Sequence, residues 1–585
     1  MRRDLQALSG KEYDLIIVGG GIFGACAAWD AALRGLSTIL LEKGDFCGAS
    51  SANHLKMVHG GIRYLQHADL PRIRESCHER STLLRIAPHL VRPLPVVIPT
   101  YGHGIKGKIA LGVAFFLYDL ITIDRNKGIR DPDRQIPGGR FISQQEILRL
   151  FPGLEIKNLT GGAIFYDGQM YNPPRLTISF LRSAADEGAA AANYVEVRGL
   201  LKKRNKIVGV KARDIFTGSD FEILSRVVLI TAGAWSHRLL EQQLGIQLNP
   251  KPVYSRDLAF VVNRKLTNKY GFAIPLKTKD SDSILNRGGR HLFVVPWRDY
   301  CLVGVWHKVF NKTQEEIGVS EEELQGFIDE ANQAYSGFAL TLEDVSMILT
   351  GLTLFGDERK QEERNLSFGK RSRLIDHGRE HGMEGLVTLL GVRATTARGM
   401  AEKALDLILR MIGSKWKRSN TSVTPIYGGQ ITCFKDFLKQ AMEQKIHGMN
   451  NNRIMRALIH NYGSKYQEVL KYTHENPSLI MPIGDSLVIK AEVIHAIREE
   501  MAHKLGDVVF RRTDLGTGAF PGEQALRTCA DLMANELGWD KKKIQAEFEE
   551  VMTTFRRRGF LNRSMYIKEF AHASSKLDHA QTCPK

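Results

Sequence analysis

The chain has 585 residues, of which 43% are hydrophobic and 25% charged, a globular composition with enough apolar residues for two to four packing units. Lysine and arginine exceed aspartate and glutamate by 81 − 64 = 17, which favours an anionic partner such as a phosphorylated substrate or anionic lipid, or else a solvated basic surface. Nucleic acid is disfavoured as a partner, because no helix-turn-helix, zinc-finger or RNP-like motif accompanies the charge.

Cysteine and histidine usage argues against disulfide and metal chemistry. The seven cysteines are dispersed and contain no CxxC pair, which favours a reducing compartment. No apolar run precedes the strand that begins at Tyr13, so we expect no signal peptide and a cytoplasmic location. We predict no metal site, because four early histidines lack ligand spacing and an acidic partner: His54, His59, His67 and His78.

The first predicted elements form a strand–turn–helix–strand unit. Residues 13–20 are a continuous apolar run typical of a buried parallel strand, and a helix over 25–34 and a strand over 37–41 follow. Glu42 ends the second strand at the spacing expected of a carboxylate that binds ribose hydroxyls. In the intervening GxGxxG turn, the glycines permit a tight bend, close approach of a pyrophosphate and close helix packing: Gly19, Gly21 and Gly24. The unit predicts a Rossmann-type dinucleotide site.

The segment after Glu42 favours FAD over NAD. An NAD enzyme would usually continue with βα repeats, whereas residues 44–61 are polar and rich in glycine and serine. Four side chains of this run are suited to follow an extended cofactor: Ser50, Ser51, Asn53 and Lys56.

Residues 109–123 are the most apolar stretch of the chain. The stretch is too short to span a bilayer, which needs about 20 residues, and it contains Asp119. We predict a buried core helix here. An interfacial helix held by the flanking lysines is the alternative.

The later segments extend the same architecture. A small antiparallel layer over 194–197 and 207–210 precedes a buried strand over 227–231. A glycine turn at 391–396 opens a helix over 397–411, whose N-terminus is suited to stabilise negative charge on a reduced flavin ring. We assign residues 1–100, 155–240 and 378–415 to the dinucleotide domain.

A substrate cap and a helical tail complete the predicted organisation. Within a cap from about 249 to 374, an antiparallel sheet is predicted from the strands 258–262, 291–295 and 300–305. Residues 413–430 have linker composition, and the chain is helical in pattern from Phe434 onward. Arg511 and Arg512 are interpreted either as a domain-packing ion network or as a partner or lipid contact.

Taken together, these segments resemble FAD-dependent, aerobic-type glycerol-3-phosphate dehydrogenases of the D-amino-acid-oxidase-like flavoprotein superfamily. The resemblance is carried by residues 14–46, 50–67, 293–297, 395–408, 460–472 and 491–516. It implies an α/β fold: a discontinuous Rossmann-type FAD-binding domain with an antiparallel substrate cap over 1–425, and an all-α domain over 426–585.

The resemblance also implies a reaction and its partners. Hydride would leave C2 of sn-glycerol 3-phosphate for the N5 atom of non-covalently bound FAD, and electrons would pass to a quinone or another acceptor. The implied location is the cytoplasm or, as a peripheral protein, the inner face of the cytoplasmic membrane. The oligomeric state, including a homodimer, stays open.

The resemblance also implies roles for the residues that match the motifs of the family. Those implied at the substrate are His59, which accepts a proton, with Arg63, Tyr64, Arg371 and Arg393. Those implied at the cofactor are Gly19, Gly21, Ile22, Phe23, Gly24, Glu42, Lys43, Ser50, Ser51, Asn53, Lys56, His59, Gly60, Gly61, Val197, Ala232, Gly233, Trp235, Gly391, Arg393, Ala394, Thr395 and Thr396.

Three positions depart from the family pattern. Leu352 lies in a turn where the family has a phosphate-binding arginine, and Arg393 replaces a lysine. Trp306-His307 replaces the end of a Gly-Thr-Thr-Asp turn, and Trp306 is interpreted either as a pocket residue or as a core tryptophan. Losing one phosphate-binding arginine costs about 2–5 kcal/mol if nothing replaces it.

Three hypotheses follow from these departures. In the first, Arg393 and Arg371 compensate for the missing arginine and the substrate is glycerol 3-phosphate. In the second, a diverged paralogue oxidises another anionic polyol, hydroxy acid or amino acid. In the third, the protein binds flavin without turnover and serves as a scaffold.

Overall fold

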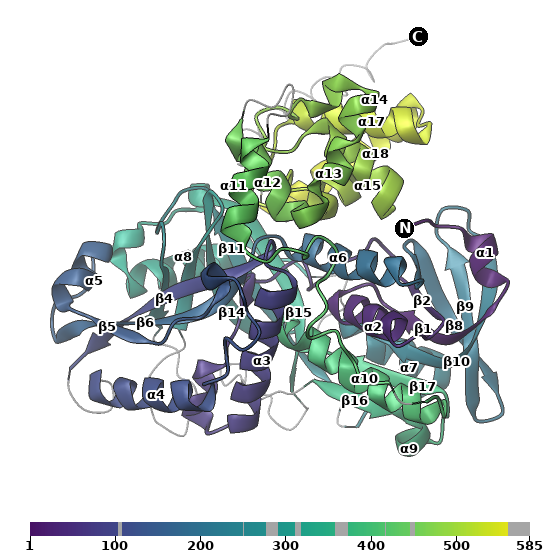
Figure 1. Cartoon of the computed structure of the whole chain (residues 1–585), viewed down its shortest axis with the longest axis horizontal. Helices are drawn as coiled ribbons and strands as arrows, with labels where there is room; N and C mark the ends of the chain where they lie inside the picture. Colours follow the sequence, from purple (N-terminus) through teal and green to yellow (C-terminus); the bar gives the residue numbers. More distant parts are fainter. Residues whose placement is uncertain are drawn as a thin grey trace, which may run out of the picture.

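Two β-sheets organise the chain from Glu12 to Leu390, and the polypeptide crosses between them several times (Figure 1). The computed structural model describes residues 1–102, 108–249, 251–276, 291–310, 317–356, 372–415, 417–444 and 451–559. The first sheet has the order β16-β17-β10-β1-β2-β7, with β8 and β9 extending from β10. Its strands are β1 (Glu12–Val18), β2 (Thr38–Leu41), β7 (Ala190–Ala192), β8 (Val195–Lys203), β9 (Lys206–Asp214), β10 (Asp220–Ile230), β16 (Arg373–Asp376) and β17 (Leu386–Leu390).

The predicted strand–turn–helix–strand unit forms the centre of this sheet. Strand β1 pairs in parallel with β10 on one side and β2 on the other, and Leu15, Ile16 and Ile17 are fully buried. Helix α2 (Ile22–Leu33) packs against α6 (Pro173–Asp186) and α10 (Ala397–Met411). The Rossmann-type fold, the β8–β9 layer and the helix over 397–411 are confirmed.

The second sheet forms the cap, with the order β15-β11-β14-β13-β12-β4-β6-β3 and β5 beside β6. Its strands are β3 (Met57–Val58), β4 (Val91–Tyr101), β5 (Arg140–Ile142), β6 (Leu159–Met170), β11 (Val253–Val262), β12 (Gly271–Pro275), β13 (His291–Trp297), β14 (Tyr300–Phe310) and β15 (Val345–Gly356). Helices α3 (Leu70–Ile86), α4 (Lys108–Ile121), α5 (Gln144–Leu150) and α8 (Glu321–Ala334) complete this half of the molecule.

The predicted bounds of the cap are too narrow. Its antiparallel strands lie where expected, but β4 and β6 also belong to this sheet, although their residues fall in or beside segments assigned to the dinucleotide domain. Strand β4 carries Pro93, Pro95 and Pro99, which hide it in the sequence. It joins the cap by pairing in parallel with β12, about 175 residues later in the chain.

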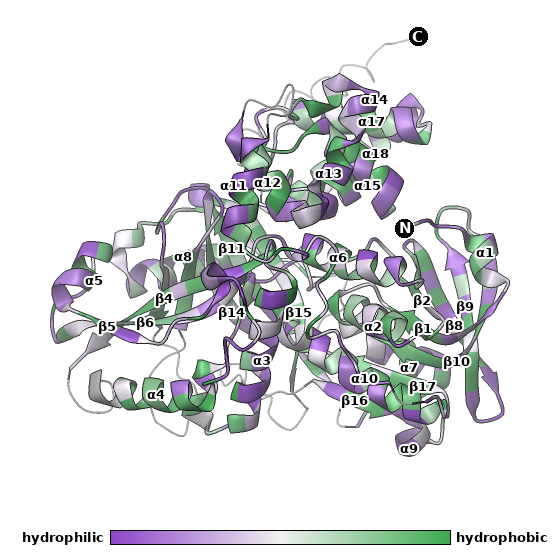
Figure 2. Ribbon diagram, in the orientation of Figure 1, coloured by the Kyte–Doolittle hydropathy of each residue, from purple (hydrophilic) through white to green (hydrophobic). Residues whose placement is uncertain are grey.

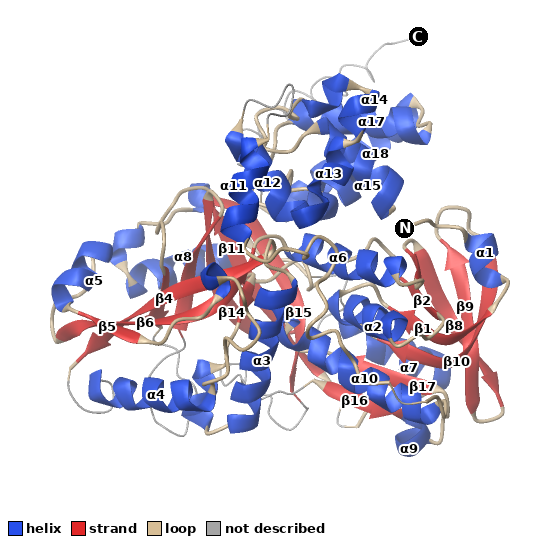
Figure 3. Ribbon diagram, in the orientation of Figure 1, coloured by secondary structure: helices blue, strands red, loops and turns tan. Residues whose placement is uncertain are grey.

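The C-terminal residues form a helical lobe, defined here as α11–α18, without strands among its described residues (Figure 3). Its helices are α11 (Phe434–Glu443), α12 (Asn452–Tyr462), α13 (Tyr466–Leu470), α14 (Tyr472–Glu475), α15 (Lys490–Glu500), α16 (Leu505–Asp507), α17 (Glu523–Leu537) and α18 (Lys541–Arg557).

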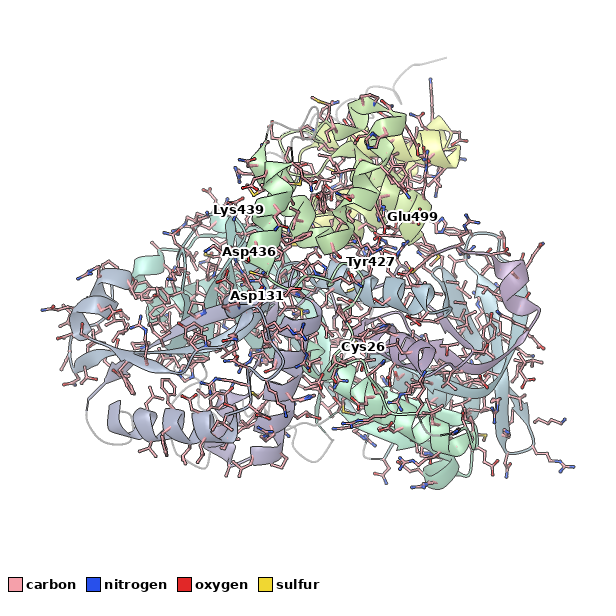
Figure 4. All side chains as sticks on the ribbon, viewed as in Figure 1. Cys26, Asp131, Tyr427, Asp436, Lys439 and Glu499 are labelled. Carbon is pink, nitrogen blue, oxygen red and sulfur yellow. The ribbon has the colours of Figure 1, made fainter. Side chains whose placement is uncertain are left out.

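The helical lobe contacts both halves of the molecule below it (Figure 4). Asp131 beside the cap accepts a hydrogen bond from the Phe434 backbone N–H at 2.8 Å. On the dinucleotide side, Arg182 of α6 donates to the backbone oxygen of Glu499 at 2.6 Å. Arg511 and Arg512 form an ion network at this boundary, with side chains 15% and 0% exposed, as in the domain-packing interpretation of the pair.

Helix α4 contradicts the prediction of a fully buried core helix. Phe115 and Tyr118 are 5% and 6% exposed and pack inward, but four apolar side chains on its outer side are exposed: Val113, Phe116, Leu117 and Leu120. Ile123, just beyond the end of the helix, is exposed as well. Helix α4 is itself composed mostly of apolar residues, which Figure 2 colours green, whereas the rest of the protein covers only one of its faces. Among the described residues, none of the helices combines the length and apolarity needed to traverse a bilayer.

Candidate active site

A cavity of about 1330 Å³ lies between the two sheets and receives residues from both. Most of the residues predicted from the sequence line it: Gly19, Gly21, Ile22, Phe23, Glu42, Lys43, Ser50, Ser51, Asn53, His59, Gly61, Arg63, Tyr64, Val197, Ala232, Gly233, Trp235, Gly391, Arg393, Ala394 and Thr395. Segments separated by more than 300 residues in the chain therefore meet at one site.

At one end of the cavity, the N-terminus of α2 opens beside the glycine turn. Gly19 has φ +114°, and a Cβ on Gly21 would lie 3.0 Å from Ser51 Oγ, so a side chain would fill this cradle. Gly21 caps α2 without a side-chain hydrogen bond, and Ile22 N–H donates to Ser51 Oγ at 3.1 Å. A turn without side chains at the N-terminus of a helix fits a diphosphate bridge.

Glu42 lies at the end of β2, on the same wall. Its carboxylate accepts hydrogen bonds from Gly20 N–H at 2.6 Å and Gly44 N–H at 2.8 Å, and burial raises its pKa. Nearby, the Lys43 ammonium lies 4.9 Å from the centroid of the Trp235 ring. A fixed carboxylate and an aromatic ring beyond the glycine turn fit the ribose and base of an adenine dinucleotide.

The segment after β3 forms the opposite end, where His59 has a buried carboxylate partner. His59 Nδ1 lies 3.3 Å from Asp167 Oδ2, and Asp167 also accepts from Gly60 N–H at 2.6 Å and from Arg80 at 3.3 Å. Burial alone would raise the pKa of Asp167, but its contacts with His59 and Arg80 hold it below the usual value. The His59 side chain remains 43% exposed, so it is held in place and still reaches the cavity.

Arg393 and Tyr64 form a second group at this end. An Arg393 Nη1 donates to the Tyr64 hydroxyl and lies 3.5 Å from Ser76 Oγ, while its Nε is buried without a protein hydrogen-bond partner among the described residues. The guanidinium lies 5.0 Å from the centroid of the Tyr64 ring. With Arg63, which also lines the cavity, this group presents cationic donors suited to an anionic ligand.

The cap contributes a second histidine–carboxylate pair that the sequence analysis missed. His307 Nδ1 lies 2.7 Å from Asp257 Oδ1, which also accepts from Ser255 Oγ at 2.7 Å, and all three residues line the cavity. Asp257 is paired across β11 and β14 with His307. Ser255 and Asp257 lie two positions apart in β11 and so share one face of the strand, and this spacing was the signal that could have revealed them.

Trp306 is a core residue and not a pocket residue. It is 7% exposed, stacks on Phe260 and Phe327, and donates to Glu330 at 2.7 Å. The alternation of side chains along β14 therefore sends Trp306 into the cap core and His307 into the cavity. Leu352 is also buried, so this departure leaves an apolar wall where the family has an arginine.

Four predicted cofactor residues do not line the cavity. Gly24 packs α2 against the glycine turn, Gly60 N–H binds Asp167, and Thr396 is buried and donates to the Arg393 backbone oxygen. Lys56 is 3% exposed and its ammonium lies 4.6 Å from the Trp297 ring centroid. Burial lowers its pKa to about 7.

Two further predictions concern Arg371 and metal ions. Arg371 lies outside the described residues. Within the part of the chain that the structure describes, no cluster of His, Cys, Asp and Glu is arranged to hold a metal ion.

Comparison with known proteins gives consistent matches along the chain. A family model described as FAD dependent oxidoreductase matches residues 14–402, and one described as C-terminal domain of alpha-glycerophosphate oxidase matches 419–544. The chain is 30% identical to glycerol-3-phosphate dehydrogenase of Synechocystis sp. over 94% of its length and 97% of that protein. It is 28% identical to the mitochondrial glycerol-3-phosphate dehydrogenase of Bos taurus over 94% of its length and 74% of that protein.

A solved structure shares the fold. The glycerol-3-phosphate dehydrogenase of Bacillus halodurans, complexed with FAD, superposes with a TM-score of 0.74 at 22% identity and covers 94% of this chain and 96% of its own. The likeness includes the two sheets and the helical lobe, since it extends over nearly the whole chain.

Proposed function

Because the chain belongs to the family of FAD-dependent glycerol-3-phosphate dehydrogenases, we propose that it oxidises sn-glycerol 3-phosphate to dihydroxyacetone phosphate. When bound, FAD supplies the acceptor for the hydride that leaves C2 of the substrate. The chain's own residues then have three tasks: to hold the cofactor, to bind the phosphate and to take the hydroxyl proton.

The residues that would hold FAD follow the cavity from end to end. The glycine turn and the N-terminus of α2 bind the diphosphate, and Glu42 binds the ribose. Ser50 and Ser51 lie between this end and the cap. The helix α10 directs its N-terminus toward the flavin end, where its dipole favours negative charge.

At the flavin end, Arg393, Arg63 and Tyr64 bind the phosphate dianion. Arg393 carries the proposal most directly, because its Nε is buried without a protein hydrogen-bond partner among the described residues, beside a cavity that also contains the dinucleotide cradle. A buried, unpartnered guanidinium donor is costly unless a ligand satisfies it.

We assign proton acceptance to His59. An imidazole that donates from Nδ1 to a carboxylate presents Nε2 as an acceptor, and the Asp167 side chain is 5% exposed against 23% for Asp257. Asp167 is also held by the Gly60 N–H and Arg80, so His59 has the more rigid support. The proton of the C2 hydroxyl passes to His59 as the hydride leaves.

Anaerobic bleaching of the flavin tests this function. We expect sn-glycerol 3-phosphate to bleach the flavin absorbance of the oxidised protein without an added acceptor. Bleaching only by another polyol phosphate, hydroxy acid or amino acid would contradict this proposal and support the diverged-paralogue hypothesis, which the buried Leu352 favours. No bleaching by any of these compounds would favour a scaffold without turnover.

We further propose that the protein works at the surface of the cytoplasmic membrane and passes electrons to a membrane quinone or another acceptor. The outer face of α4 supports this, since Phe116 and Leu120 are 68% and 58% exposed, and Ile123, just beyond the end of the helix, is 79% exposed. On its inner face, Tyr118 donates to the Gly60 backbone oxygen at 2.8 Å, so the same helix contacts the flavin end.

Substituting both Phe116 and Leu120 with glutamate is expected to reduce binding to anionic phospholipid vesicles at least tenfold. Inserting either apolar side chain into the lipid contributes about 1.5–3 kcal/mol to membrane binding. Because both side chains are exposed, their substitution should leave folding and FAD content unchanged. Co-sedimentation measures the effect. The matched control replaces Ile156 and Val423 with glutamate, since these residues lie outside α4 and are 63% and 61% exposed. Equal binding by both double variants would contradict the assignment to α4.

A further inference from the structure

The helical lobe contributes to the wall of the cavity, although every cofactor residue predicted from the sequence precedes it in the chain. Lys504, Arg511 and Glu550 all line the cavity on the side of Glu42 and Lys43. Lys504 and Glu550 form an ion pair at 2.8 Å, while Arg511 turns toward the dinucleotide domain. The lobe therefore closes part of the site that the first sheet begins.

Asp45 is the residue through which the lobe reaches the cofactor loop. Both Arg512 Nη atoms bind its carboxylate at 2.7 Å, Arg511 Nε binds one of the same oxygens, and Asn193 donates to the other at 2.9 Å. The side chains of Asp45 and Arg512 are 1% and 0% exposed. Burial alone would raise the pKa of Asp45, but the two guanidinium groups hold it below the usual value.

The loop that carries Asp45 is attached directly to the glycine turn. Asp45 is three residues from Glu42, and the residue after it, Phe46, is fully buried. The Phe46 ring packs against Gly20, since a Cβ added to Gly20 would lie 2.7 Å from that ring. Cys47 N–H donates to the Gly20 backbone oxygen at 3.0 Å. A displacement of Asp45 would therefore move both the ribose carboxylate and the turn that binds the diphosphate.

Asp507 connects the lobe to the neighbouring wall. It accepts from the Tyr194 hydroxyl at 2.6 Å and from Arg511 at 2.7 Å. Tyr194 lines the cavity, and its backbone N–H donates to the Gly44 oxygen at 2.9 Å. Two carboxylates and two arginines thus join both sides of the Glu42 region to the lobe.

We propose that the helical lobe is part of the FAD-binding machinery, with Arg511 and Arg512 as positioning residues that hold the 42–47 loop through Asp45. Binding of FAD and docking of the lobe are then coupled: each stabilises the other by the same factor. The inference rests on FAD occupying the cavity but not on the identity of the substrate.

The test measures FAD affinity directly, in the full chain and without substrate. Asp45→Asn and Arg512→Met each remove part of the link between the loop and the lobe. We expect each substitution to raise the Kd of the apoprotein for FAD at least tenfold, as measured by titration with flavin fluorescence as the signal. The matched control is Arg182→Met, which removes an ion pair of the same boundary that does not line the cavity, and we expect a change below twofold.

A second readout separates coupling from a general loss of stability. In the unsubstituted protein, we expect saturating FAD to slow proteolysis in residues 417–433, which join the lobe to the dinucleotide domain. In Asp45→Asn this protection should be reduced at full FAD occupancy. Wild-type FAD affinity in both Asp45→Asn and Arg512→Met, or an equal loss in Arg182→Met, would overturn the proposal. Neither outcome depends on whether glycerol 3-phosphate is oxidised.

Discussion

Replacing Arg393 with methionine is expected to lower kcat/KM for sn-glycerol 3-phosphate by about 30- to 5000-fold while FAD stays bound. The range corresponds to about 2–5 kcal/mol for removing one partner of a buried charged contact. Leu352, on β15, stands where the family has a phosphate-binding arginine, so this wall of the cavity has no cationic side chain at that position. Steady-state kinetics and the flavin-to-protein absorbance ratio measure the two quantities.

Two comparison variants give this prediction its specificity. Arg393→Lys restores the residue of the family pattern and should lose less activity than the methionine variant, since it keeps the charge but not the forked geometry. Arg72 also contacts the Tyr64 ring, at 4.9 Å, but does not line the cavity, so Arg72→Met should change kcat/KM less than tenfold. An Arg393→Met enzyme with wild-type kcat/KM would remove Arg393 from the substrate site.

Replacing Gly24 with alanine is expected to yield protein that lacks bound flavin. A Cβ at this position would lie 2.0 Å from the Gly19 backbone oxygen and 2.8 Å from Thr231 Oγ1. Neither neighbour can withdraw, because the Thr231 hydroxyl itself donates to the Gly19 oxygen at 3.0 Å. Relieving the overlap separates α2 from β1 and displaces the diphosphate-binding turn, at a cost of about 1–3 kcal/mol or more.

The matched control for Gly24→Ala is Gly326→Ala. Gly326 is also helical, in α8, but it is exposed, and a Cβ added there would have no neighbouring atom within 4 Å. Alanine there should leave flavin content unchanged and stabilise the protein by about 0.5–1 kcal/mol. The flavin-to-protein absorbance ratio after purification and thermal unfolding report both effects. A yellow, fully loaded Gly24→Ala protein would refute the packing argument.

Local patterns were sufficient for much of the fold. The apolar run of β1, the spacing of Gly19, Gly21 and Gly24 and the acid at Glu42 are all contained in one short segment, and they predicted the strand–turn–helix–strand unit correctly. The helix over 397–411 was likewise predicted from the glycine turn that opens it. Such signals reflect backbone geometry and burial over a few turns of chain.

The tertiary structure decided what local patterns leave open. The apolar face of α4 indicates a core helix in the sequence, but nothing among the described residues covers its outer side. Asp257 and His307 meet only because β11 and β14 pair. Trp306, the neighbour of His307 on β14, lies on the opposite face of the sheet and packs in the cap core. The link from Asp45 to Arg511 and Arg512 spans more than 460 residues. Hydrophobic period and glycine spacing are properties of a segment, whereas exposure and charge pairing depend on which distant segment packs against it.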